Sequence, residues 1–175
     1  AYEADLYLIE ATALSEQATN RLVAENAWRD KETTFGTCII LFAVVLFQFG
    51  LSTTVDDRGR WVPIASGALL AVISIGLAAH ALLVPIRVLP EAAINSYARG
   101  VGLAYQDDHA GALTAFGQAL DLAPEYGNAY YARAQSQFEL ANFEAAARDY
   151  ESSLKAGKDD VTTHWNLAWT WYRMG

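Results

Sequence analysis

The sequence predicts an all-α protein in three parts: an amino-terminal helix, a two-helix transmembrane hairpin and a carboxy-terminal array of helical repeats. Three observations lead to this division. No Pro or Gly precedes Gly36, two long runs carry no charge, and a residue pattern recurs at a fixed interval after Pro90. We therefore treat residues 1–34, 35–87 and 88–175 separately.

Residues 1–34 are predicted to form one helical stalk. Ala, Leu, Glu and Gln are frequent before Gly36, so the helix propensity is high throughout. Apolar residues recur there at spacings of three and four, forming one narrow stripe: Tyr7, Ala11, Leu14, Ala18 and Leu22. Such a stripe packs either on the protein's own carboxy-terminal part or on a second copy in a coiled coil. The helix can also continue into the first membrane span.

Residues 35–87 are predicted to form a transmembrane hairpin. The runs 33–55 and 61–86 carry no charge, and a short charged loop separates them. At about 1.5 Å per residue they reach roughly 34 and 39 Å, enough to cross a hydrocarbon core of about 30 Å. We place the spans at about residues 35–55 and 61–86. The chain is therefore predicted to be an integral membrane protein in contact with the lipid bilayer.

Charged residues around the hairpin predict its orientation. Five positive side chains flank the hairpin, namely Arg21, Arg29, Lys31, Arg87 and Arg99, whereas only Arg58 and Arg60 lie in the loop. Cytoplasmic segments carry the excess of Lys and Arg. Both termini, and with them the repeats, are predicted to be cytoplasmic.

Each predicted span carries a stripe of small residues. The first stripe is Gly36, Ala43 and Gly50, and the second is Gly67, Ala71, Ser74 and Ala78. Helices in lipid associate where small residues let their backbones approach. The two stripes are expected either to face each other inside the hairpin or to mediate association with other copies.

Composition excludes several classes of function. A net charge of −8 without a run of Lys or Arg argues against a nucleic-acid partner. The single cysteine, Cys38, cannot form an intrachain disulfide.

His80 is an intramembrane polar residue that could contact a pigment or haem, although its place near the end of the span favours an interfacial hydrogen bond. We predict no bound cofactor or metal.

The segment after Pro90 matches itself when it is shifted along the chain by about 34 residues. The matched pairs include Ala98 with Ala132, Ala112 with Ala146, Phe116 with Tyr150, and Leu120 with Leu154. The pattern resembles the tetratricopeptide repeat, which runs W-x2-L-G-x2-Y, then A-x3-F, then P. The motifs that carry the resemblance are Ala112-x3-Phe116 followed by Pro124, Ala146-x3-Tyr150, and His164-x2-Leu167-Ala168-x2-Trp171.

The resemblance covers roughly residues 92–175 and implies repeats at about 93–126 and 127–160, with an incomplete one at 161–175. Arg99 and Arg133 stand where Leu is usual, and Lys158 stands where Pro is usual. Asp107-Asp108 and Asp159-Asp160 fall at repeat turns, where Asp caps the next helix.

We found no catalytic motif and predict that the protein is not an enzyme.

The resemblance also implies a binding surface, because the first helices of such repeats line a groove. The corresponding positions are Tyr97, Val101, Tyr105, Tyr131, Gln135, Phe138, Trp165 and Trp169. An aromatic surface with few charges suits hot-spot binding of an apolar peptide or helix. Further repeats or the amino-terminal helix could instead bury these side chains.

Two functions follow from the sequence. The first is a membrane-anchored scaffold or assembly factor that binds a protein partner, including other membrane subunits or a second copy. The alternative is an accessory structural subunit of a large membrane complex, with a pigment or haem contact through His80 as a remote variant.

Overall fold

A computed structural model describes residues 2–56 and 59–175, and these residues form seven helices and no strand. The all-α prediction is confirmed. The chain divides into two compact units. We call Ala1–Arg21 with Val88–Gly175 the repeat unit, and Leu22–Arg87 the hairpin unit.

Helix α1 (Tyr2–Ser52) is continuous and contributes residues to both units. Its length follows from the unbroken helix propensity before Gly36 and the apolar run after it. The compact units divide it between Arg21 and Leu22, rather than at residue 34, where the sequence changes from charged to apolar. The boundary lies at Arg21 because the amino-terminal part of α1 contacts the helices of the repeat unit. The distribution of charge along the sequence does not reveal this contact.

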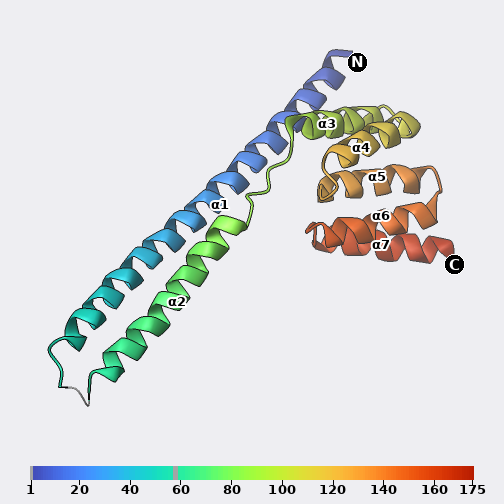
Figure 1. The fold of residues 1–175 in the computed structure, drawn as a ribbon. Coiled ribbons are helices and arrows are strands. Elements are labelled where there is room, and N and C mark those ends of the chain that lie inside the picture. Colours follow the sequence, from blue (N-terminus) through green and yellow to red (C-terminus); the bar gives the residue numbers. More distant parts are fainter. Residues whose placement is uncertain (1, 57–58) are drawn as a thin grey trace. The chain divides into compact units, whose positions relative to one another are not determined.

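In the hairpin unit, α2 (Trp61–Leu83) runs antiparallel to α1 (Figure 1). The Lys31 ammonium donates to the Val84 carbonyl at 2.8 Å, and the Ser74 hydroxyl donates to the Cys38 carbonyl at 3.3 Å. The buried residues recur every seven positions on each helix: Cys38, Val45 and Ser52 on α1, and Gly67, Ser74 and Ala81 on α2. This spacing gives two narrow facing stripes, as in a coiled coil.

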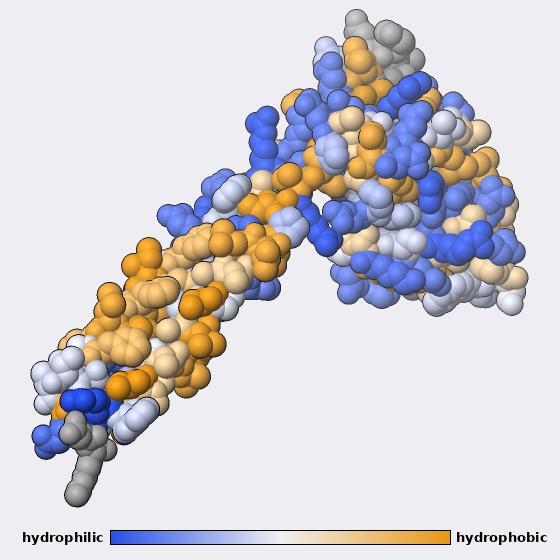
Figure 2. All heavy atoms as spheres, viewed as in Figure 1, coloured by the Kyte–Doolittle hydropathy of each residue, from blue (hydrophilic) through white to orange (hydrophobic). Residues whose placement is uncertain are grey.

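The outer surface of the hairpin unit is apolar, as the orange side chains in Figure 2 show. Ile39, Leu46 and Leu82 are each 71% exposed, whereas the contact between the helices buries mainly small or weakly polar side chains. Two helical stretches, Leu6–Ser52 and Trp61–Leu83, are long and apolar enough to cross a membrane, and only 11% of the most apolar window in each is buried. Burial of large apolar side chains, which stabilises proteins in water, is therefore nearly absent from this unit.

The repeat unit contains five shorter helices that pack in sequence, each against the next (Figure 1). They are α3 (Glu91–Tyr105), α4 (His109–Leu122), α5 (Gly127–Glu139), α6 (Phe143–Lys155) and α7 (Val161–Met174). Asp107, between α3 and α4, and Ala141, between α5 and α6, have φ of 60° and 59° and occupy equivalent positions in the sequence pattern. Non-glycine residues seldom adopt positive φ, so the recurrence shows that the two helix pairs share one turn geometry.

The cores of the two pairs also repeat. Tyr97 packs on Phe116 with ring centroids 5.9 Å apart, and the equivalent residues of the next pair, Tyr131 and Tyr150, pack at 5.7 Å. Buried alanines pack with Tyr97 in the first pair and with Tyr131 and Tyr150 in the second. Asp108 and Asp160 accept hydrogen bonds from the N–H groups of Gly111 and Thr163, which confirms that they cap α4 and α7.

Gly100 allows α4 to approach α3 closely. A Cβ at this position would stand 2.5 Å from Cε1 of the buried Phe116. We expect Gly100→Ala to destabilise the repeat unit by about 1–3 kcal/mol, lowering its thermal midpoint by several degrees in circular dichroism of the full chain.

Gly117, in α4, provides the matched control. Among the described residues, no atom outside its own helix backbone and chain neighbours lies within 4 Å of the position of a Cβ there. Gly117→Ala should therefore stabilise the helix by about 0.5–1 kcal/mol. Equal melting temperatures for the two variants would contradict the proposed role of the Gly100–Phe116 contact.

Candidate partner-binding site

The eight predicted binding residues lie on the first helices of the repeat unit: Tyr97, Val101 and Tyr105 on α3, Tyr131, Gln135 and Phe138 on α5, and Trp165 and Trp169 on α7. We call this set the first-helix face. Its exposure is uneven. Tyr105, Trp165 and Trp169 are 70%, 69% and 45% exposed, whereas Tyr97, Tyr131 and Phe138 are half-buried. The face therefore contains both packing residues and free aromatic side chains.

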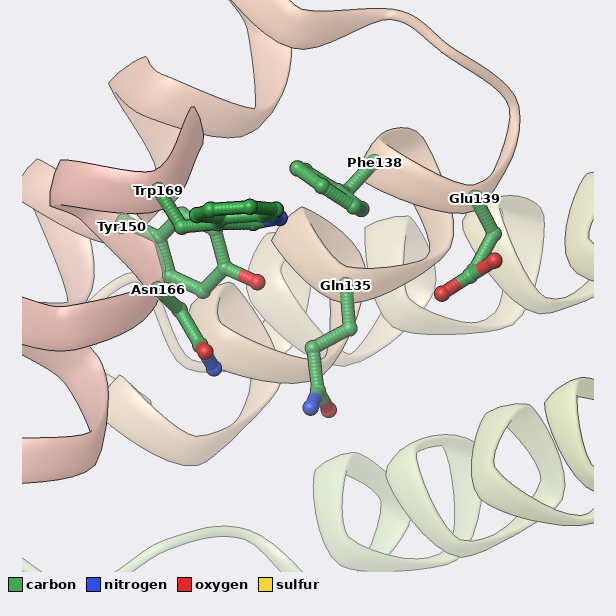
Figure 3. Close-up of a pocket in the computed structure, with 6 residues that line it drawn as sticks. All are labelled: Gln135, Phe138, Glu139, Tyr150, Asn166 and Trp169. Carbon is green, nitrogen blue, oxygen red and sulfur yellow. The ribbon is translucent and has the colours of Figure 1, made fainter. Parts of the chain in front are cut away.

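An open pocket of about 150 Å³ lies between α5, α6 and α7 (Figure 3). Six side chains line it: Gln135, Phe138, Glu139, Tyr150, Asn166 and Trp169. The rings of Phe138 and Trp169 lie on either side of the opening, and the Glu139 carboxylate points toward it. The volume is below that of a typical small-molecule site and suits one or two side chains of a partner. We call it the Trp169 pocket.

Sequence reasoning missed three side chains of this pocket, Glu139, Tyr150 and Asn166. Glu139 is the last residue of α5, and its charge makes the opening less apolar than the groove positions predicted. Tyr150 belongs to the repeat pattern, where it matches Phe116, and the structure buries its ring at 2% exposure. Only the packing of α6 and α7 against α5 brings these residues together.

Tyr131 serves packing more than binding. Its hydroxyl accepts hydrogen bonds from Asn166 Nδ2 at 2.8 Å and from Gln135 Nε2 at 3.2 Å. The Lys158 ammonium lies 4.9 Å from its ring centroid, and Tyr150 packs edge-on against it. Since these contacts join α5 to α6 and α7, truncating Tyr131 would disturb the fold as well as any bound partner.

The two departures from the repeat pattern in the second repeat have structural explanations. Arg133 makes a bidentate ion pair with the buried Asp149 of α6, with Nε–Oδ2 and Nη2–Oδ1 distances of 2.6 and 2.7 Å. Lys158 pairs with Asp160 at 2.9 Å, beside the Tyr131 ring. Both basic side chains are therefore held by charge-assisted hydrogen bonds to a carboxylate.

Glu16 of α1 contacts residues that lie beside Tyr97, the first member of the first-helix face. The Glu16 carboxylate accepts hydrogen bonds from the Tyr126 hydroxyl and from Asn128 Nδ2, both at 2.9 Å. Burial, followed by the negative charge of Glu16, raises the pKa of Tyr97 to about 12. Burial and Glu16 also raise the pKa of Tyr126. The amino-terminal helix therefore shields this end of the face.

The face of α1 that makes these contacts is not the predicted apolar stripe. Tyr7, Leu14 and Leu22 of that stripe are 69%, 65% and 59% exposed. The expectation that the stripe itself packs on the carboxy-terminal part is therefore wrong. The hydrogen bonds that Glu16 accepts and those that Asn20 makes with Leu89 select a different face of α1. The spacing of apolar residues carries no information about these bonds.

The small-residue stripes of the two hairpin helices do not face each other. Gly67 and Ser74 are buried and Ala71 and Ala78 half-buried on α2, toward α1. On α1, Ala43 and Gly50 are exposed and Gly36 is half-exposed. Among the described residues, no atom outside the helix backbone lies within 4 Å of a Cβ placed on Gly36 or Gly50. The α1 contact instead uses Cys38, Val45 and Ser52 at the same seven-residue spacing.

Gly67 provides a test of the hairpin contact. A Cβ there would stand 3.4 Å from Gln48 Cβ, so Gly67→Leu should separate the helices and expose Cys38, which is 5% exposed beside Ser74. We expect severalfold faster maleimide labelling of Cys38 in detergent. On α2 the matched control is Gly76→Leu, because Gly76 has no described neighbour within 4 Å outside its own helix backbone. Equal labelling rates in both variants would refute this contact.

His80 lies in the last turn of α2 with its side chain exposed. Within residues 2–56 and 59–175, no group of three or more His, Cys, Asp or Glu side chains is arranged to hold a metal ion.

Comparison with known proteins gives one partial similarity. No family model matches the chain. A 67-residue stretch, 38% of the chain, is 36% identical to Protein FlbA of Caulobacter vibrioides. The aligned stretch amounts to 11% of that protein's length.

Proposed function

We propose that this chain is a membrane-anchored scaffold of the tetratricopeptide type, which binds a protein partner through the exposed aromatic end of its first-helix face. The observation that carries the proposal is the pairing of Trp165 and Trp169, 69% and 45% exposed, with the Trp169 pocket. Large exposed aromatic side chains beside a small pocket are typical of binding hot spots. A partner side chain that entered the pocket would contact the Trp169 ring.

The hairpin unit supports the membrane part of the proposal. Its exposed surface is formed by large apolar side chains, and its helix contact is formed mainly by Gly, Ser, Ala and Cys. In water this distribution would expose apolar surface at a high free-energy cost. In lipid it is favourable, because close backbone approach drives helix association and apolar side chains contact acyl chains.

The repeat unit supports the part of the proposal that assigns the chain to the tetratricopeptide type. The turn geometry at Asp107 recurs at Ala141, and the ring pair Tyr97–Phe116 recurs as Tyr131–Tyr150 at the same interval along the chain. A period of about 34 residues with two helices per period is typical of tetratricopeptide repeats.

Cysteine labelling in sealed vesicles tests the topology. In a Cys38→Ser background, Arg29→Cys and Arg99→Cys should react with a membrane-impermeant maleimide from one side, and Asp56→Cys from the other. The expectation follows from the two apolar helices and from the positive residues before and after them. Labelling of residues 29 and 99 from opposite sides would rule out a two-span hairpin.

Photo-crosslinking from Trp165 tests the partner site. A photoreactive phenylalanine analogue at position 165 should give a specific adduct in native membranes, and the same analogue at position 171 should not. Trp171 is 52% exposed on the same helix, so it is matched in chemistry and accessibility. The adduct is then identified by mass spectrometry.

The identified partner allows affinity to be separated from folding. Trp165→Ala should weaken binding about thirtyfold, equivalent to about 2 kcal/mol, without changing the thermal midpoint. Trp171→Ala should leave the affinity unchanged. A loss of affinity that follows a loss of folded protein would favour a packing role for Trp165.

The alternative function, an accessory subunit of a membrane complex, is supported by the outward stripe of Gly36, Ala43 and Gly50 on α1. Small residues on a lipid-facing side permit another helix to pack closely. Adducts confined to analogues placed in this stripe, with none from position 165, would favour the subunit over the scaffold.

A further inference from the structure

We infer that residues 9–20 of α1 act as a displaceable ligand built into the chain, and that the site they occupy binds an amphipathic helix of a partner. The site is formed by Leu89, Gly102, Tyr126 and Asn128, and we call it the helix-docking site. It lies outside the Trp169 pocket. The inference rests on the proposed function only in assuming that the repeat unit receives a protein partner.

The helix-docking site recognises a carboxylate. The Tyr126 hydroxyl and the Asn128 amide both donate to Glu16 at 2.9 Å, one to each carboxylate oxygen. Tyr126 is only 3% exposed with α1 in place, so its hydroxyl is shielded from water while a helix occupies the site. A helix without a carboxylate at this position would leave a buried donor unsatisfied, at a cost of about 1–3 kcal/mol.

Two further contacts define the register of the bound helix. Ile9 packs on Gly102, where a Cβ would stand 2.5 Å from Ile9 Cγ1. The Asn20 side chain donates to the Leu89 carbonyl and accepts from the Leu89 N–H, both at 2.9 Å. Positions 9, 16 and 20 share one side of a helix. The site therefore fits a helix with an aliphatic residue, a carboxylate seven positions later and an amide four positions after that.

The contact of α1 with this site is shallow. None of the residues from Leu6 to Asn20 is buried, although Ile9, Glu16 and Asn20 are half-buried. Release of this segment would keep its internal helical hydrogen bonds and would lose only the docking contacts. The segment is therefore suited to exchange with another helix.

The negative charge of residues 1–21 limits how tightly α1 binds the helix-docking site, and a partner helix need not share it. Residues 1–21 contain four acidic residues and one arginine, and residues 88–175 contain eleven acidic and six basic residues. The two segments therefore have net charges of −3 and −5, and their long-range interaction is repulsive. A helix with the same three docking residues but fewer acidic ones should bind more tightly than α1.

Covalent connection compensates for this weakness. A segment tethered close to its site has an effective concentration of the order of 1 mM. It therefore keeps the site occupied against free ligands at micromolar concentration. Disrupting the tethered segment should unmask the site.

The experiment uses the full chain in lipid nanodiscs and a fluorescein-labelled peptide of residues 2–21 as the probe. Wild-type protein should bind the peptide weakly, and Ile9→Lys/Glu16→Lys protein should bind it at least tenfold more tightly in fluorescence anisotropy. Leu14→Lys protein is the matched control, because Leu14 is 65% exposed on the same helix. It should behave as wild type.

A peptide carrying Ile9→Lys and Glu16→Lys should not bind the unmasked protein. A Glu10→Lys peptide should bind it more tightly than the unmodified peptide at low salt, and high salt should remove the difference. Glu10 is exposed, so this change leaves the docking side chains intact.

Three results would overturn the inference. The first is equal peptide affinity of the wild-type and double-variant proteins, and the second is no binding of the peptide to the double variant. The third is loss of the repeat unit's melting transition in the double variant, because residues 9–20 would then be an integral part of the core. Protein that carries Trp165→Ala together with Ile9→Lys and Glu16→Lys should bind the peptide as tightly as the double variant does. Peptide binding can therefore persist if the partner site at Trp165 fails, and the two failures are distinguishable.

Discussion

Close approach at small residues is the constraint on which three of the helix contacts in this protein depend. Gly100 allows Phe116 to fill the space between α3 and α4, and Gly102 allows Ile9 to lie on α3. In the hairpin unit, Gly67 accommodates Gln48 and Phe49. A Cβ at Gly100 or Gly102 would stand 2.5 Å from the neighbouring side chain, and a large side chain at Gly67 would enter the space of Gln48 and Phe49, because packed interiors have little free volume. The glycines therefore set how closely neighbouring side chains approach α2 and α3.

The two units use the same constraint with opposite chemistry. The repeat unit places Phe116 and Tyr150 inside, at 1% and 2% exposure, as expected for a core formed in water. The hairpin unit places Cys38 and Ser74 inside, with reciprocal contacts between their polar atoms and backbone carbonyls, and leaves its large apolar residues outside. This distribution fits the proposed membrane location, because apolar side chains gain little from one another in lipid and small residues permit close helix contact.

Periodicity predicted the elements of the fold better than their contacts. The helices of the repeat unit, their recurrence and the caps at Asp108 and Asp160 follow from local patterns, which the sequence displays directly. The side of α1 that packs could not be predicted, because Tyr7 and Leu14 form the more apolar stripe but remain exposed. The pocket residue Glu139 was likewise missed, because its role depends on α7, which lies far along the chain.

The polar character of the α1 contact explains why a more apolar face remains free. An apolar stripe can slide along a neighbouring helix by a turn with little change in buried area, so it specifies register weakly. Glu16 and Asn20 each make two hydrogen bonds to fixed donors and acceptors, at Tyr126 and Asn128 and at the Leu89 backbone. A shift by one turn would break all four bonds and leave polar groups unsatisfied. Bonds to a charged group are stronger than neutral ones but require its partial desolvation. Such a contact specifies one register of α1 on the repeat unit without high affinity. A segment that exchanges with a partner helix, as we propose, requires both properties.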